Sequence, residues 1–446
     1  MKDLTQGSLF KHIVSMAAPI AIGMLLQTMY VIVDLYFVAK LGDAAVAGVT
    51  SASNIMFIVM ALTQMVGVGT VALMSHAVGR KDQADANHIF NQSVVLSMAC
   101  ALITLAGGFG LAGVYMNAMA PDAATRAAGI TYLYWFTPGL ALQFALVVMG
   151  SALRGTGIVK PAMAVQALTV VLNAILAPVL IAGWGTGYPM GVAGAALASS
   201  ISVAVGVITL AFYFLRLEHY VGFDLSQWSP KLETWRRMLN IGLPAGGEFA
   251  LYAVFTAIVY WIIRDFGSAA QAGFGIGSRV MSSIFLPAMA IAFAAAPIAG
   301  QNFGAKNAER VRGTFHVAAI TGCVFMGLLT LFCQWKGDAI IRFFTTDEAV
   351  VRVGAQFLHV ISWNFVAVGL VFTCSSMFQA LGNTWPSLLS TAVRLVAFAI
   401  PAIWASRQPG FELVDVWHIS VGTTTLQMCV SLLFLRAQMN KRLQFT

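Results

Sequence analysis

Long apolar segments separated by short polar ones dominate the chain from residue 12 to residue 435. Many windows without Lys, Arg, Asp or Glu exceed the roughly 20 residues that a helix needs to cross a bilayer, and some are long enough for two crossings. Dividing the longest windows at the turn-forming runs Gly183–Pro189 and Gly382–Pro386 predicts twelve transmembrane helices. The expected spans are 13–38, 46–76, 92–116, 129–152, 160–182, 189–215, 239–264, 271–300, 314–335, 355–379, 386–405 and 413–436.

The composition agrees with an all-α polytopic membrane protein. Hydrophobic residues make up 59% of the 446 positions, charged residues 9%, and the mean hydropathy is +0.82. Soluble domains, by contrast, are about one quarter charged. The amino terminus lacks the small-residue cleavage pattern of a signal peptide, so we expect the first helix to remain in the bilayer.

The basic residues indicate a membrane topology rather than a nucleic-acid partner. The formal net charge is +8, but Lys and Arg lie between apolar spans and form no clusters interleaved with aromatic residues. Most of them fall in alternate loops, beginning with the amino-terminal segment. By the positive-inside rule both termini are then cytoplasmic, and we expect a multi-pass protein of a bacterial-type cytoplasmic membrane.

The sequence contains an internal repeat that divides the chain into two halves. Matching residues of the two copies are separated by one constant offset in numbering, which is the offset from Pro19 to Pro244. The same offset relates Ala47 and Ala272, Gly48 and Gly273, Gly79 and Gly304, Lys81 and Lys306, Asp122 and Asp347, Gly129 and Gly354, Ser151 and Ser376, Gly157 and Gly382, and Pro161 and Pro386. We therefore predict two pseudo-symmetric six-helix lobes, 1–215 and 238–446, joined by a cytoplasmic linker, 216–237. Parallel repeats of this kind place a substrate path at their interface.

The first predicted helix carries one acid inside an otherwise uncharged span. Between Lys11 and Lys40 the sole formal charge is Asp34. A carboxylate at membrane depth is costly and marks a functional site by default. Helical spacing puts Gln27 and Tyr30 on the same face, so the acid belongs to a polar stripe that we expect to face protein or water.

Other polar residues within spans are weaker candidates. Tyr132, Asn173 and Ser199 are suited to hydrogen-bond Asp34, although each alone is more often an ordinary contact between helices. Glu248 follows Pro244 by one turn and is a candidate to bind a cationic substrate or a second proton, with solvation or pairing an equal alternative.

Arg279 and Arg394 are bases within predicted spans of the second half. Together they could form a basic pocket for an anionic lipid or substrate, but pairing with Glu248 or with carbonyl groups is the favoured interpretation.

Catalytic and metal-binding patterns are missing from the sequence. The five cysteines are scattered without a CxxC pair, and there is no nucleotide-binding loop, zinc-protease motif or serine-hydrolase motif. We expect no enzyme activity, no cofactor and no metal site. Any active transport must then use an ion gradient.

Several motifs, in order and spread over almost the whole chain, resemble the multidrug and toxic compound extrusion (MATE) family. These are Ala18–Asp34, Gly67–Asp82, Leu153–Pro161, Leu172–Asn173 and Gly194–Ser199. The resemblance implies an exporter with two six-helix lobes that face each other as a V and exchange inward H+ or Na+ for outward organic cations. A monomer is the family's default.

The resemblance also implies roles for three residues. Asp34 matches the acid of the family's amino-terminal cation-coupling site, Tyr132 its tyrosine and Asn173 its asparagine. Members with a second acid in this site carry Asp four residues after the asparagine, where this chain has Ala177. That departure argues against a Na+ site with two carboxylates, so we expect H+ as the coupling ion. Acids of another branch do not align either, because Tyr252 and Val368 occupy their positions.

We therefore favour a proton-coupled antiporter for amphipathic or cationic organic compounds, with Gln27, Tyr30, Ser199, Glu248, Arg279 and Arg394 as candidate substrate-binding residues. The alternatives are a Na+-coupled drug antiporter, a flippase for a lipid-linked saccharide, and a structural or receptor-like membrane protein without transport.

Overall fold

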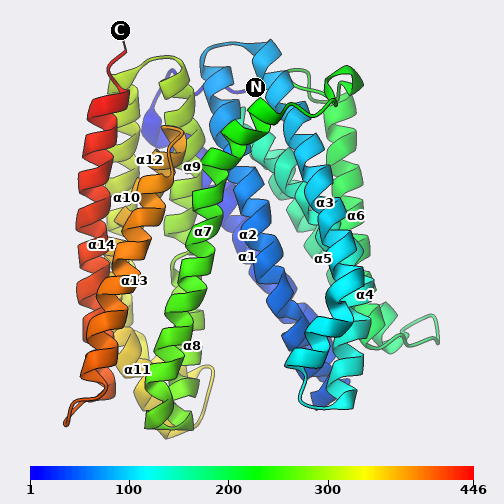
Figure 1. Cartoon of the computed structure of the whole chain (residues 1–446), viewed down its shortest axis with the longest axis vertical. Helices are drawn as coiled ribbons and strands as arrows, with labels where there is room; N and C mark the ends of the chain where they lie inside the picture. Colours follow the sequence, from blue (N-terminus) through cyan, green and yellow to red (C-terminus); the bar gives the residue numbers. More distant parts are fainter. Residues whose placement is uncertain (446) are drawn as a thin grey trace. The chain divides into compact units, whose positions relative to one another are not determined.

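The computed structural model describes residues 1–445, which form helices and three short 3-10 turns but no β-strand (Figure 1). The helices are α1 (Leu9–Ala39), α2 (Asp43–Gly79), α3 (Gln83–Met119), α4 (Ala123–Gly155), α5 (Lys160–Ala182), α6 (Val192–Arg216), α7 (Leu232–Ile263), α8 (Ser268–Ile284), α9 (Leu286–Gly304), α10 (Ala308–Arg342), α11 (Glu348–Ile361), α12 (Phe365–Ala380), α13 (Trp385–Ala405) and α14 (Leu413–Arg442), and the turns are η1 (Leu225–Gln227), η2 (Arg264–Phe266) and η3 (Ser362–Asn364).

Twelve segments within residues 1–445 are long and apolar enough to cross a membrane, which confirms the predicted all-α architecture. Two of these segments are interrupted, since α8 and α9 together make one crossing and α11 and α12 another. The first break lies at Phe285, directly before α9, which has proline in its first turn. Proline lacks the N–H that would continue the hydrogen-bond ladder, so the helix restarts there.

Equivalent helices of the two repeats begin and end at equivalent positions. The repeat offset relates both ends of α2 to those of the pair α8 and α9, and both ends of α4 to those of the pair α11 and α12. Within residues 1–445 the two non-glycine residues with positive φ are Lys81 (59°) and Lys306 (58°), which occupy the same turn of the two repeats. Asp122 and Asp347 likewise cap equivalent helices by accepting hydrogen bonds from backbone N–H groups.

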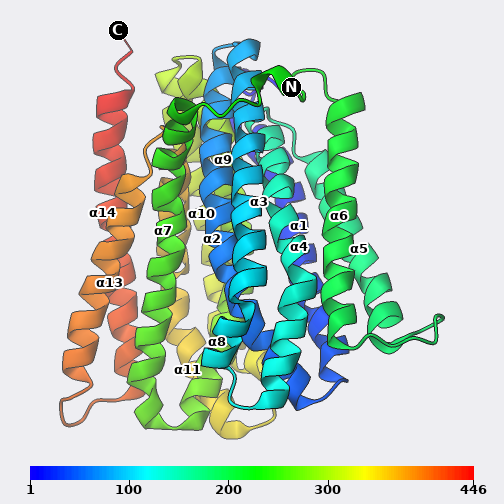
Figure 2. The same cartoon turned by 45° about the vertical axis from the view of Figure 1, so that its right-hand side comes forward.

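Matched glycines allow equivalent helices to approach closely. In the first half α2 packs on α4, and α2, α3 and α4 lie side by side (Figure 2). A Cβ atom added to Gly48 would lie 2.8 Å from the backbone nitrogen of Gly129, and one added to Gly273 would lie 3.0 Å from that of Gly354. Both helix crossings therefore require a residue without a side chain.

The chain divides into two compact units, whose boundary falls inside α1 and α7 rather than between helices. The first unit comprises Met1–Asp3 and Ile22–Leu243, and the second Leu4–Ala21 and Pro244–Thr446. The boundary lies close to the matched prolines Pro19 and Pro244. The first two-fifths of α1 thus belong to the second unit, whereas the start of α7 belongs to the first.

Side-chain amides of α3 hold the segment between α6 and α7 in place. Asn91 Nδ2 donates a hydrogen bond to the carbonyl oxygen of Gly222 at 3.0 Å, and Gln92 Nε2 donates to those of Gln227 and Ser229 at 2.6 and 2.9 Å. Because α7 begins at Leu232, the end of the expected linker, 232–237, is helical.

Leu4, which belongs to the second unit, is held in place by other residues of that unit. Leu4 is fully buried. Its backbone N–H donates to Gln301, and its carbonyl oxygen accepts hydrogen bonds from Asn302 and Arg310 at 3.2 Å each. The chain therefore enters α1 from a fixed position.

Candidate functional sites

The first unit contains a buried acid on α1. Asp34 is 9% exposed, and its Oδ1 has no hydrogen-bond partner among residues 1–445. Tyr30 lies one turn earlier on the same helix and interacts electrostatically with Asp34, while its hydroxyl approaches that of Ser199 on α6. Because Ser199 Oγ has no hydrogen-bond partner in the described chain, the contact is a close approach rather than a formed bond.

Tyr132 extends this cluster from α4. It is 3% exposed and interacts electrostatically with both Asp34 and Tyr30. Its ring packs on Phe136 with a centroid distance of 5.2 Å. Helices α1, α4 and α6 thus bring together four of the predicted site residues.

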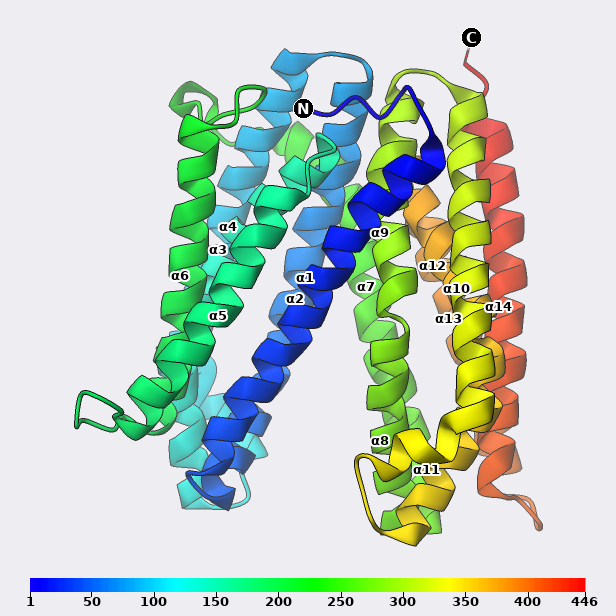
Figure 3. The same ribbon diagram turned by 180° about the vertical axis from the view of Figure 1, so that it is seen from behind.

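Asn173 on α5 is fully buried, and neither its Oδ1 nor its Nδ2 has a hydrogen-bond partner in the described residues. Helices α1 and α5 run side by side in the same direction, with Gly23 against Met163 (Figure 3). At a rise of 1.5 Å per residue, Asp34 lies about 16 Å beyond Gly23 on α1, and Asn173 lies about 15 Å beyond Met163 on α5. The unpaired amide and the unpaired carboxylate are thus displaced by similar distances in the same direction along α5 and α1.

Two further residues limit the chemistry of this site. Gln27 is exposed on α1 and has no described contact with the cluster. Ala177, one turn after Asn173, is fully buried and contributes no second acid. Within residues 1–445 there is also no group of three or more His, Cys, Asp or Glu side chains that could hold a metal ion. The site offers one carboxylate with neutral oxygens and an amide, which is suited to taking up and releasing a proton.

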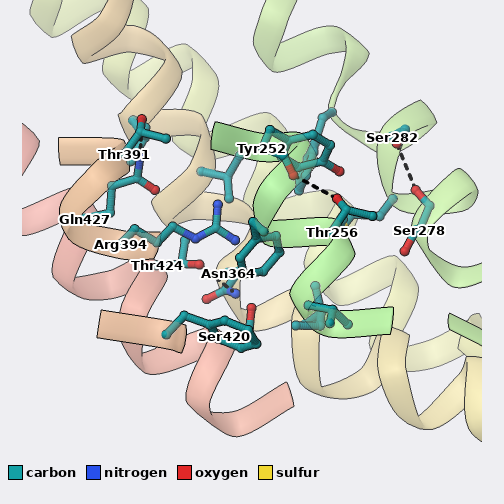
Figure 4. Close-up of a pocket in the computed structure, with 18 of the residues that line it drawn as sticks. Tyr252, Thr256, Ser278, Ser282, Asn364, Thr391, Arg394, Ser420, Thr424 and Gln427 are labelled. Carbon is teal, nitrogen blue, oxygen red and sulfur yellow. Dashed lines mark hydrogen bonds between the residues drawn. The ribbon is translucent and has the colours of Figure 1, made fainter. Parts of the chain in front are cut away.

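The second unit contains a cavity of about 500 Å³, formed by residues from α7, α8, α9 and α11 to α14 (Figure 4). Its walls are rich in aromatic residues. The rings of Phe274 and Trp417 stack with centroids 5.5 Å apart, and Phe357 meets Trp417 edge-on at 4.9 Å. Such walls accommodate flat apolar molecules with little loss of conformational entropy.

The cavity occupies the same place in the second repeat as the acid site does in the first. Six first-unit positions and their partners at the repeat offset are Gln27 and Tyr252, Tyr30 and Phe255, Asp34 and Val259, Tyr132 and Phe357, Asn173 and Phe398, and Ser199 and Thr424. All six second members line the cavity. The polar cluster of the first unit is thus replaced by a mostly apolar, aromatic lining.

One acid and one base line this cavity. Glu248 on α7 approaches the side chain of Ser387 at the start of α13. Arg394 reaches from α13 toward Tyr252, as Figure 4 shows, and its guanidinium lies 4.5 Å from the ring centre of Phe255. Arg279, by contrast, is exposed on α8 and is not part of the lining.

The sequence interpretation missed most of the cavity wall. It did not single out Phe274 or Trp417, or the hydrogen bonds from Asn364 to Thr424 and from Gln427 to Thr391, both in the lining. Periodicity alone cannot tell such residues from ordinary helix contacts. One signal was available, because adding the repeat offset to the six first-half candidates leads directly to the cavity.

Comparisons with known proteins agree with this architecture. The sequence model of the MatE family matches residues 19–179 and 244–404, so its two copies begin at the matched prolines. The chain is 27% identical to the probable multidrug resistance protein YpnP of Bacillus subtilis, over 93% of this chain and 90% of that protein. It is 26% identical to the multidrug export protein MepA of Staphylococcus haemolyticus, over 85% of this chain and 83% of that protein.

Among solved structures, the chain is similar to a MOP superfamily transporter from Pyrococcus furiosus. The TM-score is 0.92 at 24% identity, and the match covers 99% of this chain and 98% of that chain. That protein is described as having a binding pocket of reverse polarity that suggests a different function. At this level of identity the likeness establishes the fold.

Proposed function

Because this chain belongs to the MatE family of membrane transporters, we propose that it is a secondary exporter that exchanges inward H+ for outward amphipathic organic compounds. The observation that carries the proposal is Asp34, a buried acid with an unpaired oxygen, surrounded by neutral polar groups within the bilayer-spanning part of the first unit. Both chain termini face the cytoplasm in this proposal, and the transporter acts as a monomer.

The composition of the acid site favours H+ over Na+. A sodium ion must exchange its water shell for several protein oxygens, and a second carboxylate would offset that cost. With Ala177 in place of such an acid, Asp34 is left with neutral partners. A proton needs only the single carboxylate. Protonation removes a buried charge and changes the contacts with Tyr30 and Tyr132, which gives the two protonation states different preferred conformations.

The cavity of the second unit supports aromatic, amphipathic cargo. Phe255, Phe398 and the stacked pair of Phe274 and Trp417 provide an apolar wall. Glu248 provides an acid that attracts cationic groups. The relatives named above as multidrug resistance and multidrug export proteins are in keeping with a broad cargo range.

Transport by purified protein in proteoliposomes tests the proposal. We expect an imposed pH gradient, at constant Na+, to drive export of a fluorescent organic cation such as ethidium. Asp34→Asn, which mimics the protonated acid at nearly equal volume, should fold but lose this exchange. Asp265→Asn is the matched control, because Asp265 is exposed and lies outside both sites. Undiminished exchange in Asp34→Asn would remove the acid from the mechanism, and transport driven by Na+ at constant pH would overturn the choice of ion.

The flippase alternative predicts a different outcome in cells. A lipid-linked saccharide flippase should leave drug and dye accumulation unchanged, whereas its deletion should alter surface polysaccharide. The proposed exporter should instead lower dye accumulation in a manner that an uncoupler abolishes.

A further inference from the structure

The cavity of the second unit contains a guanidinium that has no acceptor in the protein. Arg394 lines the cavity, yet it donates no hydrogen bond and forms no ion pair with any residue in 1–445, and its Nε is buried without a partner. Its described contacts are the face of the Phe255 ring at 4.5 Å and an electrostatic interaction with Tyr252. Sequence reasoning favoured pairing of this base with Glu248 or with carbonyl groups, and the structure contains neither bond.

Glu248 does not pair with Arg394. Its carboxyl group approaches the side chain of Ser387, which lies seven residues before Arg394 on α13, a distance of about 10 Å along the helix axis. The acid on α7 and the base on α13 therefore occupy separate places in the cavity lining. Each is available to a different group of a bound molecule.

An unpaired guanidinium in an apolar cavity is costly, because it loses water without gaining acceptors. Its N–H groups form a planar fork that fits the two oxygens of a carboxylate, and such charge-assisted pairs are stronger than neutral hydrogen bonds. An acid group on the ligand would satisfy it. The equivalent position in the first unit is Thr169, so this feature belongs to the second unit alone.

We propose that this cavity binds aromatic compounds that carry an acid group, with the acid on the Arg394 guanidinium and the ring system against Phe398 and the stacked pair of Phe274 and Trp417. The inference rests on the proposed export function in treating the ligand as cargo. It extends the cargo from cations to amphipathic organic acids, including zwitterions whose cationic group reaches Glu248.

Calorimetric titration of the purified full-length protein in detergent, corrected by titration of detergent alone, tests the proposal with three probes of one shape. These are 2-naphthoate, 2-naphthamide and 2-naphthylmethylammonium. We expect wild-type protein to bind naphthoate at least about tenfold more tightly than naphthamide, in line with the gain of a charge-assisted bidentate contact. Equal affinities for the two, or tighter binding of the amide than of the acid, would overturn the proposal, whereas the ammonium compound reports separately on the site of Glu248.

Variants assign the preference to one side chain. Arg394→Gln should reduce the preference for naphthoate to within about twofold, and Arg394→Lys, which keeps the charge without the fork, should give an intermediate value. Arg279→Gln is the matched control, since it removes an exposed base of the same unit outside the cavity, and it should retain the full preference. A preference that survives in Arg394→Gln, or disappears equally in Arg279→Gln, would contradict the assignment.

The result can be separated from that of the transport experiment. Arg394 donates no hydrogen bond to the described protein, so Arg394→Gln should unfold at the wild-type temperature or above. If Arg394→Gln proves unstable, the binding preference of Arg394→Lys provides a second readout. Because the titration uses no ion gradient, it reports on acid recognition even if H+ coupling proves wrong. Loss of the acid preference would likewise leave proton-driven export of cations intact.

Discussion

Tyr132 of α4 and Phe357 of α11 occupy equivalent positions in the two repeats and differ by one hydroxyl group. Tyr132 interacts electrostatically with Asp34, whereas Phe357 packs edge-on against Trp417 in the wall of the cavity. The same backbone plan therefore supports a polar acid site in one unit and an aromatic cavity in the other. In the function proposed here, the first serves the coupling ion and the second the cargo.

Adding a second carboxylate near Asp34 should make transport respond to Na+. Ala177→Asp should introduce transport driven by a Na+ gradient at constant pH, because two acids can replace much of the ion's water shell. Ala402→Asp is the matched control, since Ala402 is the equivalent buried position of the second unit, where Val259 replaces Asp34. It should give no Na+ response. Proteoliposome flux under an imposed Na+ gradient is the measurement, and a response of equal size in both variants would refute this account.

The close crossing of α2 and α4 predicts a loss of stability on adding one methyl group. In Gly48→Ala the new Cβ would lie 2.8 Å from the backbone nitrogen of Gly129 and from the carbonyl oxygen of Thr125. Moving backbone atoms apart should cost about 1–3 kcal/mol of unfolding free energy. Gly107→Ala on α3 meets nothing within 4 Å and should stabilise by up to about 1 kcal/mol. Thermal unfolding in detergent compares them, and equal melting temperatures would show that the crossing can relax.

The segment before α7 should loosen in acid. Hydrogen bonds from the Ser226 side chain and backbone, and then from Gln227, hold the pKa of Asp224 below its usual range. Because the pKa of Asp224 is lower in the folded protein than in the unfolded chain, the ionised carboxylate stabilises the folded segment at neutral pH. This stabilisation is lost as the pH falls below the ordinary value of about 3.9 and through the folded-state value.

Limited digestion with pepsin measures this effect. Asp224→Ala should be cleaved between α6 and α7 faster than wild type at pH 4.5, and the difference should shrink as the pH approaches 2.5. A difference that is constant across this range would mean that the Asp224 charge does not secure the segment.

The distribution of basic residues predicts the orientation in the membrane. In a cysteine-free background, Ser226→Cys should lie on the cytoplasmic side and Thr186→Cys on the outer side; both positions are exposed. An impermeant thiol reagent applied to intact cells should therefore label position 186 and leave position 226 unlabelled until the cells are opened. Strong labelling at 226 in intact cells would reverse the topology.

The sequence by itself determined the helices, the repeat and the buried acid. Uncharged apolar runs of this length have no stable alternative to helix within a bilayer, because every backbone polar group must find its partner inside its own segment. The repeat could be detected because turns and helix ends depend on local residue types, such as the glycines and the capping Asp122 and Asp347. Asp34 stood out because a charge is rare at membrane depth.

The tertiary structure alone decided which of these residues meet. Helical periodicity fixes the face on which a side chain lies but not the neighbour that it contacts, so Asp34, Tyr132 and Ser199 were joined only by the packing of α1, α4 and α6. The same holds for Arg394, whose lack of an acidic partner could not be predicted from its position on α13. The cavity is likewise a product of packing, because it consists of space left between aromatic side chains from helices far apart in the chain.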